Sequence, residues 1–121
     1  MSVSYLGPNG SFTQIALIKY FSNDTEQVSK RTIDEVFRSV EIRETDYGVV
    51  PIENSLEGSV NNTHDLLIGS SINIYDEIQL RIRQCLISKA SDINEIDKVY
   101  SHPQSFAQCQ SWLKVNLPTA D

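Results

Sequence analysis

Three short polar segments of this chain carry the side chains best suited to hold a small anion. Each follows an apolar, strand-like run and precedes a stretch with helical periodicity. In parallel α/β sheets, ligands lie beyond the carboxyl ends of the strands, where loop amides and the next helix N-terminus can bind an anion. We therefore expect the three segments to share one cleft. The candidate contacts are Asn54, Ser55, Gly58 and Ser59 in the segment that starts at Pro51, Gly10 and Ser11 near the N-terminus, and Ser101, His102 and Gln104 near the C-terminus.

Each candidate also has a purely structural interpretation. Asn54 and Ser55 are residue types that stabilise turns and cap helices, and their position after an apolar strand is what favours a ligand contact. His102 comes just before a predicted helix, whose dipole disfavours the imidazolium form. It is as well suited to orient its loop by a hydrogen bond as to touch a ligand. Ser11 fits a helix cap, a cleft residue, or both.

The elements that must position these side chains alternate between strand and helix. Thr32 and Glu35 form a capping box before a run of helical spacing, which predicts the second helix. Gly58 and Ser59 are expected to begin the third helix, and Pro103 suits the first turn of the last one. This order predicts an α/β fold with mainly parallel pairing. Strands are expected at 2–6, 27–29, 47–50 and 98–100, and helices at 11–21, 32–40, 59–68 and from 103 onward.

One further expected strand is unusually long. From residue 72 to residue 82 apolar side chains alternate with polar ones, with an interruption at Asp76. Alternation with a period of two predicts a strand with one buried face. A strand of this length could cross from one lobe of a protein to another. Residues 88–95 then form a polar connection that is capable of forming a helix.

Periodicity also predicts which side chains are buried. Cys85 and Cys109 have no histidine at metal-ligand spacing, so they are interpreted as small buried residues that stay reduced. His64 lies among apolar positions and is interpreted as structural. Helical spacing places Phe12, Ile15, Ala16 and Lys19 on one face of the first helix, and Val60, His64 and Leu67 on one side of the third. In the last helix, the residues expected to form the inward stripe are Phe106, Cys109 and Leu113.

Taken together and in this order, the three polar segments resemble the prephenate dehydratases. The resemblance runs from Tyr5 to about Leu113. The residues that carry it are Pro51-Ile52-Glu53-Asn54-Ser55-Leu56-Glu57-Gly58-Ser59-Val60, Gly7-Pro8-Asn9-Gly10-Ser11-Phe12-Thr13 and Ser101-His102-Pro103-Gln104. The departures are conservative, because Ser11 and Thr13 stand where the family often has Thr and Ser, and Ser105 where it often has Ala.

The resemblance implies the two-lobed architecture of type II periplasmic binding proteins, with the ligand between the lobes. Residues 1–73 would form the first lobe, and residues 74–121 the crossover strand and part of a second lobe that is left incomplete. The family's catalytic domain continues to a Thr-Arg-Phe tripeptide, whose threonine is thought to be the catalytic acid and which this sequence lacks. The catalytic residue is therefore unknown for this chain. We also expect the family's regulatory ACT domain to be absent.

The activity that the resemblance implies is the decarboxylating dehydration of prephenate to phenylpyruvate, on the route to phenylalanine, in a chain that we expect to be truncated. No metal or organic cofactor is expected, because protonating the departing hydroxyl is enough when aromatisation drives the reaction. Glu53 and Glu57 are not assigned a catalytic role, since bare carboxylates repel a dianionic substrate. The alternative is a non-catalytic module of the same fold that binds a small carboxylate such as an aromatic amino acid.

The composition argues against other classes of function. A net charge of −6 disfavours nucleic acid and anionic membrane surfaces as partners. The apolar runs are too short to span a bilayer and the N-terminus has no signal-peptide pattern, so we expect a cytoplasmic protein. An incomplete second lobe would leave apolar surface exposed, so we expect a homo-oligomer.

Overall fold

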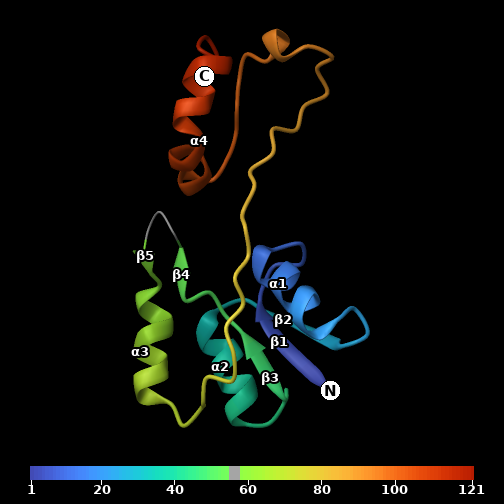
Figure 1. The fold of residues 1–121 in the computed structure, drawn as a ribbon, viewed down its shortest axis with the longest axis vertical. Coiled ribbons are helices and arrows are strands. Elements are labelled where there is room, and N and C mark those ends of the chain that lie inside the picture. Colours follow the sequence, from blue (N-terminus) through green and yellow to red (C-terminus); the bar gives the residue numbers. More distant parts are fainter. Residues whose placement is uncertain (55–57) are drawn as a thin grey trace. The chain divides into compact units, whose positions relative to one another are not determined.

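The computed structural model describes residues 1–54 and 58–121, which form two compact units, Met1–Arg81 and Ile82–Asp121 (Figure 1). Among the described residues, none of the helices combines the length and the apolar composition that a membrane span requires. The elements in chain order are β1 (Ser2–Leu6), α1 (Phe12–Phe21), β2 (Glu26–Lys30), α2 (Ile33–Glu41), β3 (Tyr47–Val49), β4 (Glu53–Asn54), β5 (Gly58–Ser59), α3 (Asn61–Gly69), the short 3-10 helix η1 (Ile93–Glu95) and α4 (Pro103–Asn116).

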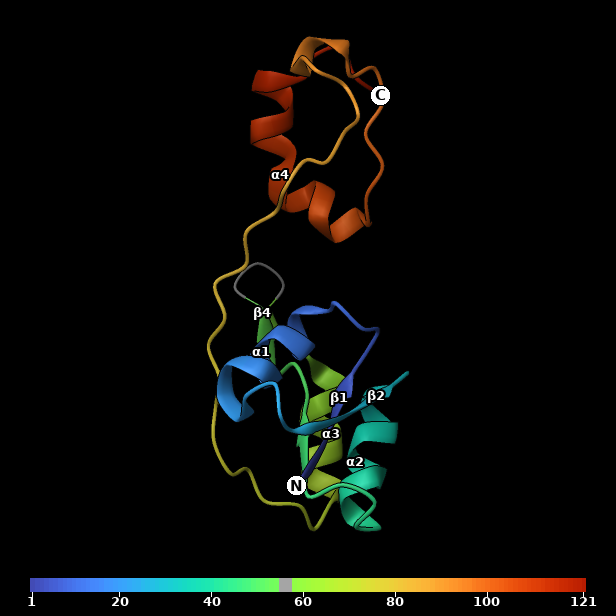
Figure 2. The same ribbon diagram turned by 90° about the vertical axis from the view of Figure 1, so that its right-hand side faces the viewer.

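A parallel three-stranded sheet in the order β2-β1-β3 forms the centre of the first unit. Tyr5 of the central strand pairs with Ser29 of β2 on one side and with Val49 of β3 on the other. Helix α1 covers one face of this sheet and α2 covers the other (Figure 2). The predicted α/β order with parallel pairing is therefore confirmed for this unit.

The apolar core lies between the sheet and α1. Val3 and Tyr5 alternate with Ser4 along β1, and they pack against Leu17 of α1. All three core side chains are at most 1% exposed. Because successive side chains of a strand point to opposite faces, Ser4 is directed to the α2 side.

The face of α1 that helical spacing predicted from Phe12, Ile15, Ala16 and Lys19 is not uniformly buried. Ala16 is buried, but Phe12 and Ile15 are each almost half exposed, and Lys19 is exposed as well. Leu17 is the residue of this helix that enters the core. The helix is apolar around most of its circumference, so the spacing of its apolar residues fits more than one inward face.

Helix α2 begins where its capping box predicts. The Thr32 hydroxyl accepts a hydrogen bond from the Glu35 amide at 3.2 Å, while the Glu35 carboxylate accepts from the Arg31 amide, one residue earlier than in the usual box. Close approach of α2 to the sheet depends on Gly48, because a Cβ there would lie 2.8 Å from Cγ1 of Val36.

The segment after β3 differs from its prediction. Gly58 and Ser59 do not begin a helix; they form β5, which pairs antiparallel with Asn54 and Glu53 of β4. Helix α3 starts two residues later, at Asn61. The positive φ of Gly58 (77°) favours a reversal of the chain over a helical turn at this point.

The buried residue of α3 is also different from the prediction. His64 is exposed, whereas Thr63 is fully buried. Leu67 is half-buried, as is Val60, which is the N-cap residue. The side of α3 that is turned inward is therefore offset by one position from the one expected.

The long strand expected at residues 72–82 is not formed. No strand is assigned to any of these residues, all of which the structure describes. The segment runs in extended form (yellow in Figure 1), with Ile74 68% and Tyr75 73% exposed. An alternating pattern can specify a strand, but a strand also requires a hydrogen-bonded neighbour, and no strand of the described residues pairs with this segment.

The second unit consists of η1, α4 and extended chain. Phe106, Cys109 and Leu113 are half-buried on the predicted inward side of α4. Cys85 is exposed, so the prediction that both cysteines are buried is wrong for it; both are free thiols. Cys85 lies in extended chain that does not pack under a helix or sheet.

No strand is assigned at residues 98–100, contrary to the prediction. Two backbone hydrogen bonds nevertheless join this region to the last residue of the sequence. The Val99 amide donates to the Asp121 carbonyl and the Asp121 amide donates to the Asp97 carbonyl, each at 2.8 Å. This is the pattern of a single parallel bridge, too short to count as a strand.

Candidate functional site

Two of the three predicted polar segments leave the same edge of the parallel sheet. β1 and β3 are neighbours and run in the same direction, with Tyr5 opposite Val49, so both strands end at their carboxyl side together. The segment with Gly10 and Ser11 follows β1, and the segment with Asn54 follows β3. This arrangement is the one that creates a ligand crevice in open α/β sheets.

The turn after β1 satisfies its own hydrogen-bonding groups. The Ser11 hydroxyl donates to the Leu6 carbonyl (3.1 Å) and accepts from the Gln14 amide (3.3 Å), which makes Ser11 the N-cap of α1. The Gly10 amide donates to Oε1 of Gln14 at 2.6 Å. A ligand that bound the Gly10 amide would have to displace the Gln14 side chain. Ser11 therefore has the structural role of a helix cap.

The segment after β3 has a different local structure. Asn54 is half-buried in β4 and pairs with Gly58 of β5, while Glu53 pairs with Ser59. Gly58 and Ser59 are exposed. Ser55, the remaining candidate of this segment, lies outside the described residues. β5 ends at Ser59 and α3 begins at Asn61, so Asn54 pairs with the residue of β5 that is farther from the helix.

The N-cap residue of α3 does not cap the helix with its side chain. This residue is Val60, which has no hydrogen-bond acceptor in its side chain and makes no capping bond. The first amides of a helix have no intrahelical partner, and the helix dipole adds partial positive charge there. The amides of Asn61 and Asn62 are thus suited to an anion, next to the hairpin that carries Asn54.

The third predicted segment belongs to the second unit. Ser101, His102 and Gln104 are all exposed. His102 is the N-cap of α4, and its Nδ1 accepts a hydrogen bond from the Gln104 amide at 3.3 Å. Its structural interpretation, in which it orients its own loop, therefore holds within this unit. That the third segment shares a cleft with the other two stays a prediction.

Sequence reasoning overlooked Thr63 as a residue of this region. Its hydroxyl donates to the Pro51 carbonyl at 2.7 Å, and its exposed fraction is 0%. The sequence contained a signal for it, because Thr63 lies three residues after Val60 and four before Leu67. A polar residue at an inward helical position must find a hydrogen-bond partner.

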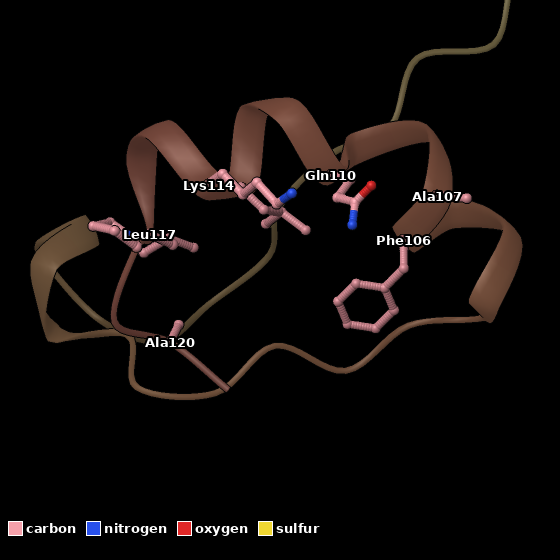
Figure 3. Close-up of a pocket in the computed structure, with 8 residues that line it drawn as sticks. Phe106, Ala107, Gln110, Lys114, Leu117 and Ala120 are labelled. Carbon is pink, nitrogen blue, oxygen red and sulfur yellow. The ribbon is translucent and has the colours of Figure 1, made fainter.

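Two pockets of the described residues are lined by no predicted site residue. One, of ≈ 410 Å³, lies along α4, where Phe106, Leu113 and Leu117 contribute its apolar part and Gln110 and Lys114 its polar part (Figure 3). The other, of ≈ 270 Å³, lies between α2 and α3. Within residues 1–54 and 58–121, no group of three or more His, Cys, Asp or Glu side chains is placed to hold a metal ion.

Comparison with known proteins gives a consistent result. The model of the prephenate dehydratase family matches residues 3–121. A bifunctional chorismate mutase/prephenate dehydratase of Neisseria gonorrhoeae is 45% identical over 122 residues, which cover 100% of this chain and 34% of that protein. The corresponding protein of Aquifex aeolicus is 43% identical over 119 residues, 98% of this chain and 33% of that protein. The chain thus spans about a third of the length of these curated relatives.

A solved structure shows the same fold. The crystal structure of prephenate dehydratase from Arthrobacter aurescens in complex with L-Phe matches with a TM-score of 0.75 and 29% identity, over 100% of this chain and 41% of that one. The parallel α/β arrangement is therefore that of a type II periplasmic-binding-protein-like fold, present here as a partial domain. With the family match over residues 3–121, this shows that the chain belongs to the prephenate dehydratase family.

Proposed function

We propose that this chain provides the substrate-binding edge of a prephenate dehydratase, the lyase that converts prephenate to phenylpyruvate with loss of water and carbon dioxide. The observation that carries the proposal is the junction of the paired strands β4 and β5 with the N-terminus of α3, whose N-cap residue Val60 makes no side-chain capping bond. That junction combines Asn54, the Gly58 and Ser59 backbone and two helix amides at the carboxyl edge of a parallel sheet.

The reaction depends more on the positioning of the substrate than on reactive side chains. Prephenate carries two carboxylates and a ring hydroxyl, and it becomes aromatic once that hydroxyl leaves as water. Neutral donors that hold the carboxylates, together with one weak acid for the hydroxyl, are sufficient. The junction offers neutral donors and the positive end of a helix dipole, which attract a carboxylate. Glu53 is exposed on β4 and is not assigned a role, because its charge would oppose the substrate.

The proton donor is assigned by family resemblance to a Thr-Arg-Phe segment, which does not occur in this sequence. We therefore propose a division of tasks in which these residues bind prephenate and the proton comes from elsewhere. On the same resemblance we infer that residues 1–73 correspond to a first lobe and residues 74–121 to a crossover and part of a second lobe. The site requires no cofactor in this scheme.

The test is calorimetric titration of prephenate into the purified chain, with phenylpyruvate formation measured in parallel. The informative variant is Asn54→Ala, and its matched control is Asn23→Ala, an exposed asparagine in the turn after α1. We expect prephenate to bind the wild type and Asn23→Ala alike, and to bind Asn54→Ala about tenfold more weakly, the equivalent of one lost hydrogen bond to a charged group.

Three results would change the proposal. Equal binding by both variants would remove Asn54 from the site. Phenylpyruvate formation that depends on Asn54 would place the proton donor within these residues. Binding of phenylalanine but not of prephenate would favour a non-catalytic module for aromatic amino acids.

We also propose that the chain is cytoplasmic and self-associates. Tyr100, Val115 and Ile87 are 86%, 79% and 90% exposed, which is unusual for large apolar side chains within one 40-residue unit. A second copy that covers this surface would remove it from water. Light scattering that reports a monomer at all working concentrations would contradict self-association.

A further inference from the structure

We infer that Thr63 is a positioning residue for the proposed prephenate site, an inference that rests on the proposed function. Thr63 lies in the first turn of α3 and is fully buried, so it does not touch a ligand itself. Its hydroxyl donates to the Pro51 carbonyl at 2.7 Å. Pro51 is three residues before Asn54, at the point where the chain leaves β3 for the hairpin.

A second hydrogen bond fastens the next residue of the same segment. The Val60 amide donates to the Ile52 carbonyl at 2.9 Å, so two successive carbonyls before β4 bond to the first residues of α3. The hairpin and the helix N-terminus are the two parts of the proposed site. Thr63 and Val60 therefore fix the distance between Asn54 and the first amides of α3.

The threonine side chain is specific to this task. Pro51 lies past the end of β3 (Tyr47–Val49), so its carbonyl is not part of the sheet ladder and accepts a hydrogen bond from the Thr63 hydroxyl instead. A valine at position 63 would fill the same volume and leave that carbonyl without the hydroxyl. The carbonyl would then turn toward another donor or toward water, and the β4 strand would move with it.

The experiment compares Thr63→Val and Thr63→Ser with a matched control, Thr45→Val. Thr45 is a second buried threonine of the same unit, 3% exposed, and its hydroxyl is hydrogen-bonded to that of Ser4 at 3.0 Å on the α2 side of the sheet. Both valine variants remove one buried hydroxyl, so both are expected to lower the melting temperature. Only Thr63→Val removes a bond to the segment that leads to Asn54.

Two measurements are made on each variant. Prephenate affinity is expected to fall about tenfold in Thr63→Val, the size of one misplaced hydrogen bond, and to stay within twofold of wild type in Thr63→Ser and Thr45→Val. Amide hydrogen exchange at Val60 is expected to become faster in Thr63→Val only, because that amide depends on the placement of Ile52. The serine variant retains the hydroxyl and decides the question if Thr63→Val does not fold.

The two measurements separate this inference from the proposed function. If the wild type does not bind prephenate, the proposed function fails, and exchange at Val60 still tests whether Thr63 holds the hairpin. If Thr63→Val and Thr45→Val lower the affinity equally, or if Val60 exchanges at the wild-type rate in Thr63→Val, the positioning role of Thr63 is refuted. A loss of affinity in Thr63→Ser equal to that in Thr63→Val would also refute it.

Discussion

The two compact units of this chain bury their side chains to very different extents. Met1–Arg81 contains a three-stranded sheet between two helices, with Val3, Tyr5 and Leu17 at most 1% exposed. In Ile82–Asp121, all of whose residues the structure describes, Leu117 alone is buried, and it lies just past the end of α4. A helix can bury one face only against another layer, and the second unit has no sheet to provide it.

This difference in burial indicates which unit holds the proposed site in place. The strands β4 and β5 and helix α3 belong to the first unit, and the core residues Val3, Tyr5 and Leu17 come from that same unit. A unit of 40 residues with one buried apolar side chain is at the lower limit of autonomous stability. We therefore expect the first unit to determine the free energy of unfolding, and the second to lose its structure at lower denaturant.

The largest expected effect is that of Leu17→Ala. Removing this fully buried side chain leaves a cavity against β1, and we expect a loss of about 2–5 kcal/mol from the free energy of unfolding. Leu117→Ala is the matched substitution in the second unit, and we expect it to leave the unfolding of the first unit unchanged. The measurement is urea denaturation followed by far-ultraviolet circular dichroism, which is dominated here by the larger unit.

Trp112 provides an independent probe of the second unit, because it lies on α4 and is the single tryptophan of the sequence. Its fluorescence should change at lower urea than the circular dichroism signal, and Leu117→Ala should shift only the fluorescence transition. Coincident transitions for both probes, displaced equally by either variant, would show that the two units unfold as one. The contrast between the units would then not extend to their stability.

The contrast between the units also separates what the sequence could predict from what it could not. In the first unit the parallel strands and α2 follow from local signals, because Thr32 caps its helix and Tyr47 to Val49 is an apolar run. The strand predicted around Asp76 is not formed, and the reason is non-local. The segment's alternating pattern was correct for a strand, but pairing depends on a neighbour that no local pattern reveals.

The candidate site likewise has features that local sequence patterns predict and features that they do not. Polar residues after β1 and β3 were predicted from the order of the elements, and the shared sheet edge is confirmed. The hairpin at Gly58 and the burial of Thr63 were overlooked, because each depends on how the chain returns to Pro51 and Ile52. Helix periodicity located α3 correctly to within two residues, yet an offset of one position changed which side chain is buried.

A smaller effect is expected from two helix N-cap residues, Ser11 of α1 and His102 of α4. Ser11→Ala removes the acceptor for the Gln14 amide and the donor to Leu6, so we expect a loss of about 1 kcal/mol in the stability of the first unit. His102→Ala removes a longer, exposed contact to the Gln104 amide, and should alter only the Trp112 transition. Ser11→Asp, which retains a capping acceptor, should recover most of the lost stability. If His102→Ala destabilises the first unit more than Ser11→Ala, the assignment of each cap to its own unit is wrong.

The smallest effect concerns the extended segment that ends the first unit. The Tyr20 hydroxyl donates to Oδ2 of Asp76 at 2.6 Å, and this bond raises the pKa of Tyr20 to about 12. The same bond, aided by the Glu77 amide, lowers the pKa of the Asp76 carboxyl below its usual value of 3.8. Stability from the lowered Asp76 pKa is present above pH 3.8 and is lost as pH falls through the folded-state value. Stability from the raised Tyr20 pKa is complete below pH 10.0 and is lost as pH rises through about 12.

Because both side chains are exposed, we expect the contact to order the extended segment locally and to add little to global stability. Tyr20→Phe retains the ring contact with Phe21 and removes the hydroxyl, so it should return the Asp76 pKa toward its usual value in an NMR titration. At pH 8, trypsin should then cleave after Arg81 faster in Tyr20→Phe than in the wild type. Asp76→Asn should be cleaved as fast as Tyr20→Phe if the negative charge of Asp76 is what holds the segment. Tyr100→Phe, at an exposed tyrosine of the second unit, should change neither quantity. An Asp76 pKa that is unaffected by Tyr20→Phe would show that the extended segment is not attached to α1 in solution, and the first unit would then end before Asp76 rather than at Arg81.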